Sequence, residues 1–369
     1  MQIRTLSLVD WRSYEQANVS FCDGLTAIIG KNGQGKTNLI EAIGWVAGIG
    51  SFRGAVDDAL IRDGADSAVV RATVEADDGR EQLIEAAVQR AGRNRVQVNR
   101  QRLQRMSDLA SVLHATVFSP DDLELVKGGP ALRRGWLDAA VAARRPSNGS
   151  LRADVERVLK QRNALLRGVH GRLDADAAFT LDVWDTKLAE LGERLLAART
   201  DVLAEMATTL ASAYDAVSRE SADVTAVYQS SWEGSLADAL VQARDSDVRR
   251  GITTVGPHRD DVLLCIGGLP ARTHASQGEQ RSLALALRLA ADGIVRAASI
   301  AEPVLLLDDV FSELDPNRAA ALLEALPAGQ HILTTAAELP PGAQPAQVIR
   351  VHRGDVTSCL LYTSDAADE

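Results

Sequence analysis

The sequence has 369 residues, of which 46% are hydrophobic and 24% are charged, and this composition excludes wholesale disorder. No apolar run reaches the roughly 20 residues of a membrane helix, no signal peptide opens the chain, and the 3 cysteines are isolated, so we expect a cytoplasmic protein with no membrane partner. The formal net charge of −10 at first argues against a nucleic-acid partner as well.

The N-terminal part of the chain alternates between short strands, turns and one helix. Residues 37–46 follow a glycine-rich turn and carry Leu39, Ile40, Ile43 and Val46 at helical spacing. Strands are predicted where β-type runs lie between turn-forming residues, at 3–9, 16–21, 25–29, 68–75, 82–89 and 95–98.

The middle of the chain is predicted to be helical. No proline occurs between Pro146 and Pro257, and apolar residues from Leu151 to Val202 recur at steps of three, four and seven. A helix over roughly 177–219 would be about 60 Å long. We expect an antiparallel hairpin or bundle here rather than a dimeric rod.

From Gly256 onward the pattern returns to alternating strands and helices. We expect both α/β segments to build one sheet, so the fold class is α/β with a helical insertion. Strands are predicted at 262–266, 304–307, 331–334 and 348–356, the last with a turn at Gly354-Asp355, and helices at 279–296 and 316–326.

A phosphate-binding loop is predicted at Gly30–Thr37, which fits the pattern G-x-x-x-x-G-K-[ST] between a strand and a helix. Glycines let backbone N–H groups converge on phosphate oxygens, and the helix N-terminus adds its dipole. Lys36 would reach the β- and γ-phosphates, and the Thr37 hydroxyl would join the Mg²⁺ shell. The alternative is a glycine-rich turn without nucleotide. The predicted contacts in this loop are Gly30, Asn32, Gly33, Gly35, Lys36, Thr37 and Asn38.

An apolar strand that ends in two carboxylates, Val304–Asp309, provides the partner of Lys36. Asp308 would hold Mg²⁺ directly or through water, and Asp309 would orient or deprotonate the attacking water. Alone, carboxylates at the end of a strand often only cap the next helix. Together with the loop, it makes Lys36, Asp308 and Asp309 the predicted catalytic residues and Thr37 and Asp308 the predicted metal ligands.

Ser276–Arg281 precedes a predicted helix and has two interpretations. Ser276 and Glu279 fit a capping box, which needs no ligand. Alternatively, the helix N-terminus binds a γ-phosphate, with Ser276, Gly278 and Gln280 as nucleotide contacts. The same choice, between a capped turn and a functional motif, applies to Ser312–Asp315.

One segment of the chain is basic, although the chain as a whole is acidic. Residues 80–172 contain 18 Arg and Lys against 9 Asp and Glu, a net of +9, which leaves −19 for the rest of the chain. This segment is either a solvated face or a surface for DNA phosphates. An aromatic content of 4% argues against base stacking as the main contact. The candidate DNA contacts are Arg93, Arg95, Arg100, Arg102, Arg133 and Arg134.

His258–Asp261 reads His-Arg-Asp-Asp and could suggest a metal site or a catalytic triad. One histidine with two aspartates is a thin set of metal ligands, and no nucleophile accompanies it. The motif therefore predicts a salt-bridged turn, with a role in the response to nucleotide or DNA as the alternative.

The order of these motifs resembles an ATPase head of the ABC type, in the form found in chromosome-maintenance and DNA-repair proteins. Such heads carry a coiled-coil arm between their two halves, and the short insertion here narrows the resemblance to the bacterial RecF family. The likeness extends over residues 1–357 and includes Ser51–Arg53, Phe118–Leu123, Arg133–Asp138 and Gly256–Asp261.

The resemblance implies an ABC-type P-loop ATPase head split by a short antiparallel coiled-coil arm. The head would comprise residues 1–130 and 251–358, and the arm residues 131–250. Residues 359–369 resemble a translated sequencing adapter, and we expect them not to be native.

The resemblance also implies that ATP and Mg²⁺ bind between two heads, with Ser276 and Gly278 of one protomer facing the γ-phosphate at Lys36 of the other. A homodimer would form on ATP binding and be released by weak, DNA-stimulated hydrolysis. Asp309 stands where most ABC-type heads carry glutamate, which suits a slow ATPase. The resemblance further implies a clamp on duplex or gapped DNA that acts with RecR and RecO and helps to load RecA at gaps, in recombinational repair and replication-fork restart.

Two other functions compete with this interpretation. A nucleotide-binding scaffold without turnover is left open by Asp309. A transporter ATPase subunit would carry a Q-loop glutamine and a switch histidine and would lack a basic arm. We recognise no Q-loop glutamine in the sequence. We recognise no switch histidine either, because Thr334 and Thr335 end the strand where it is expected.

Overall fold

The structure is a computed structural model that describes residues 1–103, 106–299, 302–336 and 338–360. It divides the chain into two compact units. The first, here the head unit, contains Met1–Asp122, Ala216–Arg219 and the described residues from Ser299 onward. The second, here the helical unit, contains Leu123–Asp215 and Glu220–Ala298, and so extends beyond the expected arm of 131–250 on both sides.

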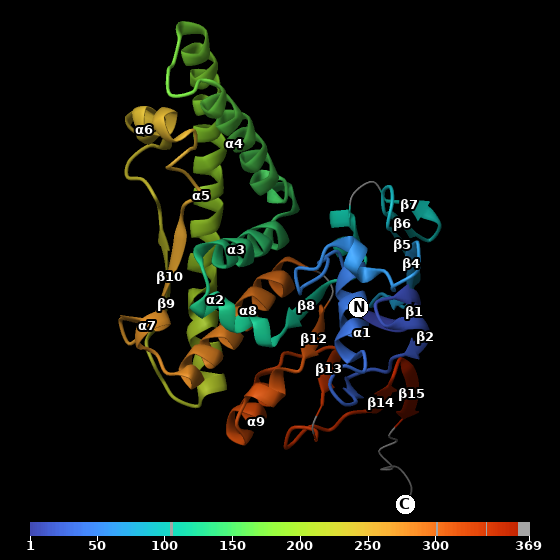
Figure 1. Cartoon of the computed structure of the whole chain (residues 1–369). Helices are drawn as coiled ribbons and strands as arrows, with labels where there is room; N and C mark the ends of the chain where they lie inside the picture. Colours follow the sequence, from blue (N-terminus) through green and yellow to red (C-terminus); the bar gives the residue numbers. More distant parts are fainter. Residues whose placement is uncertain (104–105, 300–301, 337, 361–369) are drawn as a thin grey trace, which may run out of the picture. The chain divides into compact units, whose positions relative to one another are not determined.

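A six-stranded sheet forms the centre of the head unit, in the order β15-β14-β3-β13-β12-β8 (Figure 1). All neighbours are parallel except β14 and β15. Strands from before and after the helical unit lie next to one another in this sheet, which confirms that the two α/β segments fold together. The expectation of one sheet is wrong, because other predicted strands lie in two further sheets. The strands are β3 (Leu25–Ile29), β8 (Ala115–Phe118), β12 (Val304–Asp308), β13 (His331–Thr335), β14 (Gln347–His352) and β15 (Asp355–Leu360).

A second, antiparallel sheet in the head unit has the order β2-β1-β4-β5-β6-β7. Burial alternates along β4, because one of its faces packs on the core and the other meets solvent. Trp11 meets Trp45 of α1 (Lys36–Val46) edge to face, with ring centroids 6.3 Å apart, so sheet and helix share one core. The strands are β1 (Gln2–Trp11), β2 (Tyr14–Ser20), β4 (Ser67–Glu75), β5 (Glu81–Gln89), β6 (Arg95–Val98) and β7 (Gln101–Arg102).

Two long helices, α4 (Leu151–Gly168) and α5 (Ala175–Ser218), run side by side in the helical unit (Figure 1). Residues at the predicted apolar spacing, among them Val155 and Val158 of α4 and Leu188 of α5, share one buried cluster. This arrangement confirms the antiparallel hairpin. The other helices of this unit are α2 (Glu124–Lys127), α3 (Pro130–Arg144), α6 (Leu236–Arg250), α7 (Ala271–His274) and α8 (Gln277–Ala298).

The interval between Pro146 and Pro257 is not helical throughout, which corrects the sequence-based expectation. Its residues Val224–Gln229 form strand β9, which pairs with β10 (Asp261–Ile266) in a three-stranded sheet. The third strand is β11 (Leu269–Pro270). A strand of six residues depends on a distant partner for its hydrogen bonds, so the local pattern did not reveal it.

The C-terminal segment forms a hairpin of β14 and β15, whose turn lies within one residue of the predicted turn at Gly354-Asp355. β15 pairs with β14 as far as Leu360, so the strand continues into the segment expected to be non-native. The rest of that segment, 361–369, lies outside the described residues. The head unit also contains α9 (Pro316–Ala325) and short 3₁₀ helices at Asp57–Leu60, Met106–Ser111 and Val310–Glu313. No described helix is both long and apolar enough to span a membrane.

A buried ion network connects three segments of the helical unit. The Arg162 guanidinium on α4 is fully buried and donates hydrogen bonds to Asp185 (2.6 Å), Asp247 (2.7 Å) and the hydroxyl of Thr253 (2.9 Å). These acceptors lie on α5, on α6 and after α6. One side chain therefore joins three segments.

Replacing Arg162 with alanine is expected to destabilise the helical unit by about 3–5 kcal/mol, because buried Asp247 loses its counter-charge. Asp185 keeps its ion pair with Arg244 at 2.8 Å. The matched control is Arg157→Ala, also on α4, whose ion pair with Asp154 is exposed and contributes little. Urea unfolding followed by circular dichroism compares the two variants. Equal unfolding midpoints would show that the network does not stabilise the unit.

Candidate nucleotide-binding site

The phosphate loop connects β3 to α1 in the head unit, and two of its glycines have left-handed backbone. Gly33 and Gly35 have φ angles of 78° and 112°, which residues with a Cβ rarely adopt. Gly35 also lies against Tyr14, whose hydroxyl donates a 3.0 Å hydrogen bond to its carbonyl oxygen. A Cβ on Gly35 would lie 2.7 Å from that hydroxyl. The loop therefore needs glycine here for both conformation and space.

The β14–β15 hairpin supports the other side of the loop. A Cβ on Gly30 would overlap the carbonyl oxygen of Val351, and the backbone N–H of Arg353 donates to Gln34 Oε1 at 2.6 Å. A cavity of about 450 Å³ lies beside the loop. Its lining includes Gly30, Lys31, Gln34 and residues 350–353 of the hairpin.

Lys36, the first residue of α1, folds back over the loop. Its Nζ donates to the carbonyl oxygens of Gly30 (2.7 Å) and Lys31 (3.1 Å). Burial lowers the pKa of Lys36, and the charges of Asp309 and Asp308 oppose that shift. The ammonium group thus lies near both predicted carboxylates, and a phosphate would offer it a charged acceptor in place of two carbonyls.

Asp308 ends β12 beside the phosphate loop. Its Oδ1 accepts hydrogen bonds from the hydroxyls of Thr37 and Thr334, each at 2.8 Å. Burial raises the pKa of Asp308, the two hydroxyl hydrogen bonds lower it, and neighbouring Asp309 raises it further. The structure therefore brings together the predicted metal ligands Thr37 and Asp308, which are far apart in sequence.

Asp309 follows with left-handed backbone, at a φ of 51°. Its N–H donates to Thr334 Oγ1 at 2.9 Å. Its Oδ1 is buried and has no hydrogen-bond partner in the described part of the chain. A buried carboxylate oxygen without a partner is suited to bind water or a ligand.

The oxygen donors of this site fit Mg²⁺. The ion prefers oxygen ligands and is usually held in phosphate sites by one or two carboxylates together with phosphates and water. No cluster of three His, Cys, Asp or Glu able to hold a metal occurs among the described residues. Thr37 and Asp308 would therefore hold Mg²⁺ together with a nucleotide rather than alone.

Ser276 and Gly278 lie at the start of α8, in the helical unit. Ser276 is exposed and forms the predicted capping box with Glu279, with hydrogen bonds of 2.7 and 3.3 Å. Gln280 is buried, and its Nε2 donates to the carbonyl oxygens of Ala271 and Arg272 in α7. The side chain therefore fixes α7 to α8, and the assignment of Gln280 as a nucleotide contact stays a prediction.

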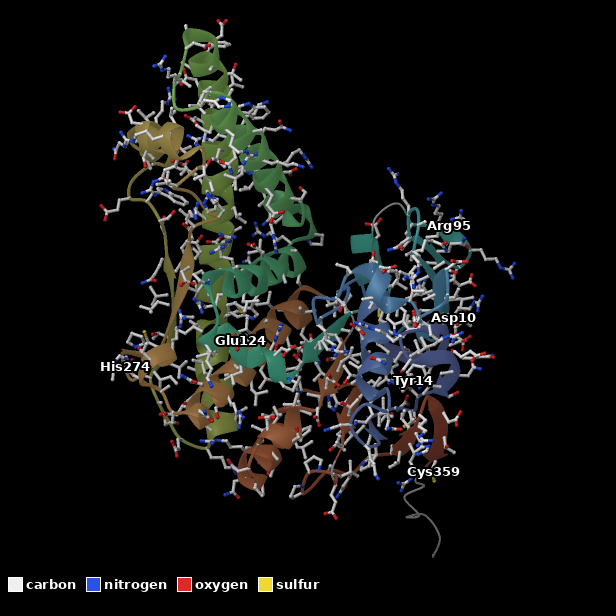
Figure 2. The ribbon with its side chains drawn as sticks, viewed as in Figure 1. Asp10, Tyr14, Arg95, Glu124, His274 and Cys359 are labelled. Carbon is white, nitrogen blue, oxygen red and sulfur yellow. The ribbon has the colours of Figure 1, made fainter. Side chains whose placement is uncertain are left out.

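Four of the six candidate DNA-binding arginines are exposed in the head unit, at and between β5, β6 and β7. Figure 2 labels Arg95 at the end of this sheet, where several nitrogen-tipped side chains extend outward. Arg93, Arg100 and Arg102 are also exposed. These four positions remain candidates.

The other two arginines, Arg133 and Arg134, lie on α3 in the helical unit. Arg133 is buried, and its guanidinium binds the Asp261 carboxylate through hydrogen bonds of 2.7 and 2.9 Å. This is a correction, because such a guanidinium is not accessible to a DNA phosphate. Arg134 is half-buried and donates to the carbonyl oxygen of Asp260 at 2.7 Å. Arg133 is therefore no longer a candidate, whereas Arg134 stays a prediction.

The His258–Asp261 motif forms a structural turn. Besides the ion pair of Asp261 with Arg133, Asp260 accepts hydrogen bonds from the Tyr228 hydroxyl and the Ser231 N–H. Burial lowers the pKa of His258 to about 4, so its ring is neutral at physiological pH. These contacts agree with the salt-bridged turn.

Sequence reasoning recognised Thr334 as the end of a strand but assigned it no role. In the structure its hydroxyl contacts both Asp308 and the backbone of Asp309. A usable signal was present, because β13 was predicted as a strand and the carboxyl ends of neighbouring parallel strands meet at one sheet edge. Tyr14, labelled in Figure 2, was missed because nothing in the sequence pairs it with Gly35.

Comparison with known families gives one description for nearly the whole chain. The family model described as "RecF/RecN/SMC N terminal domain" matches residues 2–338. A relative from Streptomyces avermitilis, described as "DNA replication and repair protein RecF", is 43% identical over 352 residues, covering 91% of this chain and 94% of the relative. A relative of the same description from Frankia alni is 45% identical over 355 residues, and the match covers 91% of this chain and 93% of that relative.

Solved structures agree with these matches. A structure described as the recombination mediator protein RecF with ATP in the RecFOR pathway has a TM-score of 0.88 and 28% identity, covering 97% of each chain. An Smc head bound to the C-winged helix domain of ScpA has a TM-score of 0.59 and 18% identity, and the match covers 99% of this chain and 98% of the Smc chain. The second likeness shows that this chain shares the fold of the Smc head.

Proposed function

This chain belongs to the RecF family, and from that premise we propose that it is an ATPase of DNA replication and repair whose nucleotide state controls its binding to DNA. The observation that carries the proposal is the 2.8 Å hydrogen bond between Thr37 and Asp308, which joins the phosphate loop to the acidic strand across 271 positions of the sequence. The relatives named as replication and repair proteins, and the solved relative with ATP, support the setting and the ligand.

In the proposed mechanism, the phosphate loop and Lys36 bind the β- and γ-phosphates of ATP through backbone N–H groups and the ammonium charge. Thr37 and Asp308 hold Mg²⁺, which when bound offsets phosphate charge. Asp309 orients the attacking water and accepts its proton through the buried Oδ1. An aspartate extends less far than a glutamate, which is consistent with slow hydrolysis.

The composite ATP site of the proposed homodimer uses two protomers. Ser276 and Gly278 of one protomer would approach the γ-phosphate bound at Lys36 of the other, so ATP would act as part of the interface. The exposed start of α8 supports this role, because its backbone N–H groups suit an anion. Slow, DNA-stimulated hydrolysis would then release the dimer.

The proposed DNA partner, duplex or gapped, would contact the exposed cluster Arg93, Arg95, Arg100 and Arg102. Arginines bind phosphates strongly and without sequence preference. Within this proposal the chain acts in the cytoplasm with RecR and RecO and helps to load RecA at gaps in recombinational repair and fork restart. The family membership supports these partners.

The proposal is tested by measuring affinity for duplex and gapped DNA in the presence of ATP and of ADP, at several salt concentrations. We expect tighter binding with ATP and a steep weakening with salt. Changing the four exposed arginines to glutamine should flatten the salt dependence, whereas Arg71→Gln, on β4, should not. Equal affinity with both nucleotides would contradict the coupling, and absence of single-turnover hydrolysis would favour a scaffold.

A further inference from the structure

Thr334 lies at the carboxyl end of β13, directly beside the acidic strand. It pairs with Asp308 in the β12–β13 register and is fully buried. Its hydroxyl donates to Asp308 Oδ1 at 2.8 Å and accepts from the N–H of Asp309 at 2.9 Å. One hydroxyl therefore contacts both the candidate metal ligand and the backbone of the candidate base.

The hydrogen bond from the Asp309 N–H to Thr334 stabilises a backbone conformation that is unfavourable for this residue type. Asp309 has a φ of 51°, a left-handed conformation that is disfavoured for a residue with a Cβ. The orientation of its carboxylate depends on this backbone, because Oδ1 makes no hydrogen bond to any described residue. The Thr334 hydroxyl thus helps to determine where Asp309 points.

The hydrogen bond to Asp308 acts on the metal side of the site. Asp308 Oδ1 accepts from Thr37 on one side and from Thr334 on the other, each at 2.8 Å. The carboxylate is therefore held between the phosphate loop and β13. Groups that hydrogen-bond a metal ligand orient it, and their loss commonly reduces metal affinity or activity.

We propose that Thr334 is a positioning residue for ATP hydrolysis, which orients Asp308 toward Mg²⁺ and fixes the backbone that carries Asp309. This inference rests on the proposed ATPase activity. It assigns a function to the end of a strand that has no switch histidine. A buried threonine that only fills space would instead be replaceable by valine, which has nearly the same shape.

The test compares Thr334→Val, which removes the hydroxyl, with Thr334→Ser, which keeps it. The matched control is Thr26→Val, because Thr26 is also fully buried in this sheet and bonds to Gln347 outside the site. Two quantities are measured: kcat at saturating Mg²⁺ and ATP, and the Mg²⁺ concentration at half-maximal binding of a fluorescent ATP analogue. The second quantity requires no hydrolysis.

We expect Thr334→Val to lower kcat by about 10- to 100-fold and to raise the Mg²⁺ midpoint several-fold. Binding of the analogue at saturating Mg²⁺ should be retained, Thr334→Ser should restore both quantities to near wild type, and Thr26→Val should change neither. The proposal is wrong if Thr334→Val behaves like Thr26→Val, or if serine fails to rescue. If the wild-type protein does not hydrolyse ATP, the proposed function fails, while the Mg²⁺ midpoints still decide whether Thr334 acts on Asp308.

Discussion

Replacing Lys36 with alanine is expected to weaken ATP binding by about 10- to 100-fold, because the ammonium group that would form charged hydrogen bonds with the phosphates is lost. The variant also loses the Lys36 hydrogen bonds to the carbonyl oxygens of Gly30 and Lys31, but the left-handed turns at Gly33 and Gly35 and the Tyr14 contact do not involve the Lys36 side chain. Titration calorimetry with ATP and Mg²⁺ measures the affinity. The ATP-dependent gain in DNA affinity should be lost as well.

The neighbouring Lys31 provides the control for Lys36. Its side chain is exposed, and Lys36 contacts only its backbone carbonyl oxygen, so Lys31→Ala removes the same charge without removing that acceptor. We expect a much smaller change in ATP affinity for this variant. Similar losses for both lysines would show that general charge, rather than the position of Lys36, determines binding.

Replacing Asp309 with asparagine is expected to slow hydrolysis by about 10²- to 10⁴-fold, the range for loss of a general base. ATP binding should be retained, because neither Thr37 nor Asp308 is altered. Single-turnover hydrolysis measures the rate. The proposed ATP-bound dimer should therefore persist longer on DNA, as size-exclusion chromatography with ATP would show.

Asp315→Asn is the matched control for this substitution. Asp315 caps α9 by accepting hydrogen bonds from the N–H groups of Asn317 and Arg318, and asparagine caps helices about as well as aspartate. The hydrolysis rate should stay near that of the wild type. If Asp309→Asn also kept the wild-type rate, another group would have to act as the base.

Local patterns predicted much of the head unit. The strands 25–29 and 95–98 were predicted with the observed limits, and the helix 37–46 differs by one residue. These elements lie next to strong local signals, namely a glycine-rich loop and turn-forming residues. Strand β8 was not predicted, because its four residues gain their hydrogen bonds from β12, far along the chain.

The composition of the basic segment was informative only in part. It predicted arginines for DNA contact, yet Arg133 is buried and forms an ion pair with Asp261. Gln280 likewise packs against α7 instead of facing solvent. A side chain's partner and burial depend on residues far away in sequence, which composition does not record.

The sequence by itself determined the phosphate loop, the acidic strand and the split α/β organisation, because glycine requirements and hydrophobic periodicity are local properties of the chain. Only the tertiary structure decided that Thr37, Asp308 and Thr334 share one hydrogen-bonded chain and which arginines reach solvent. These outcomes depend on how strands separated by hundreds of residues align in one sheet, and that alignment sets each side chain's distance, burial and charge environment.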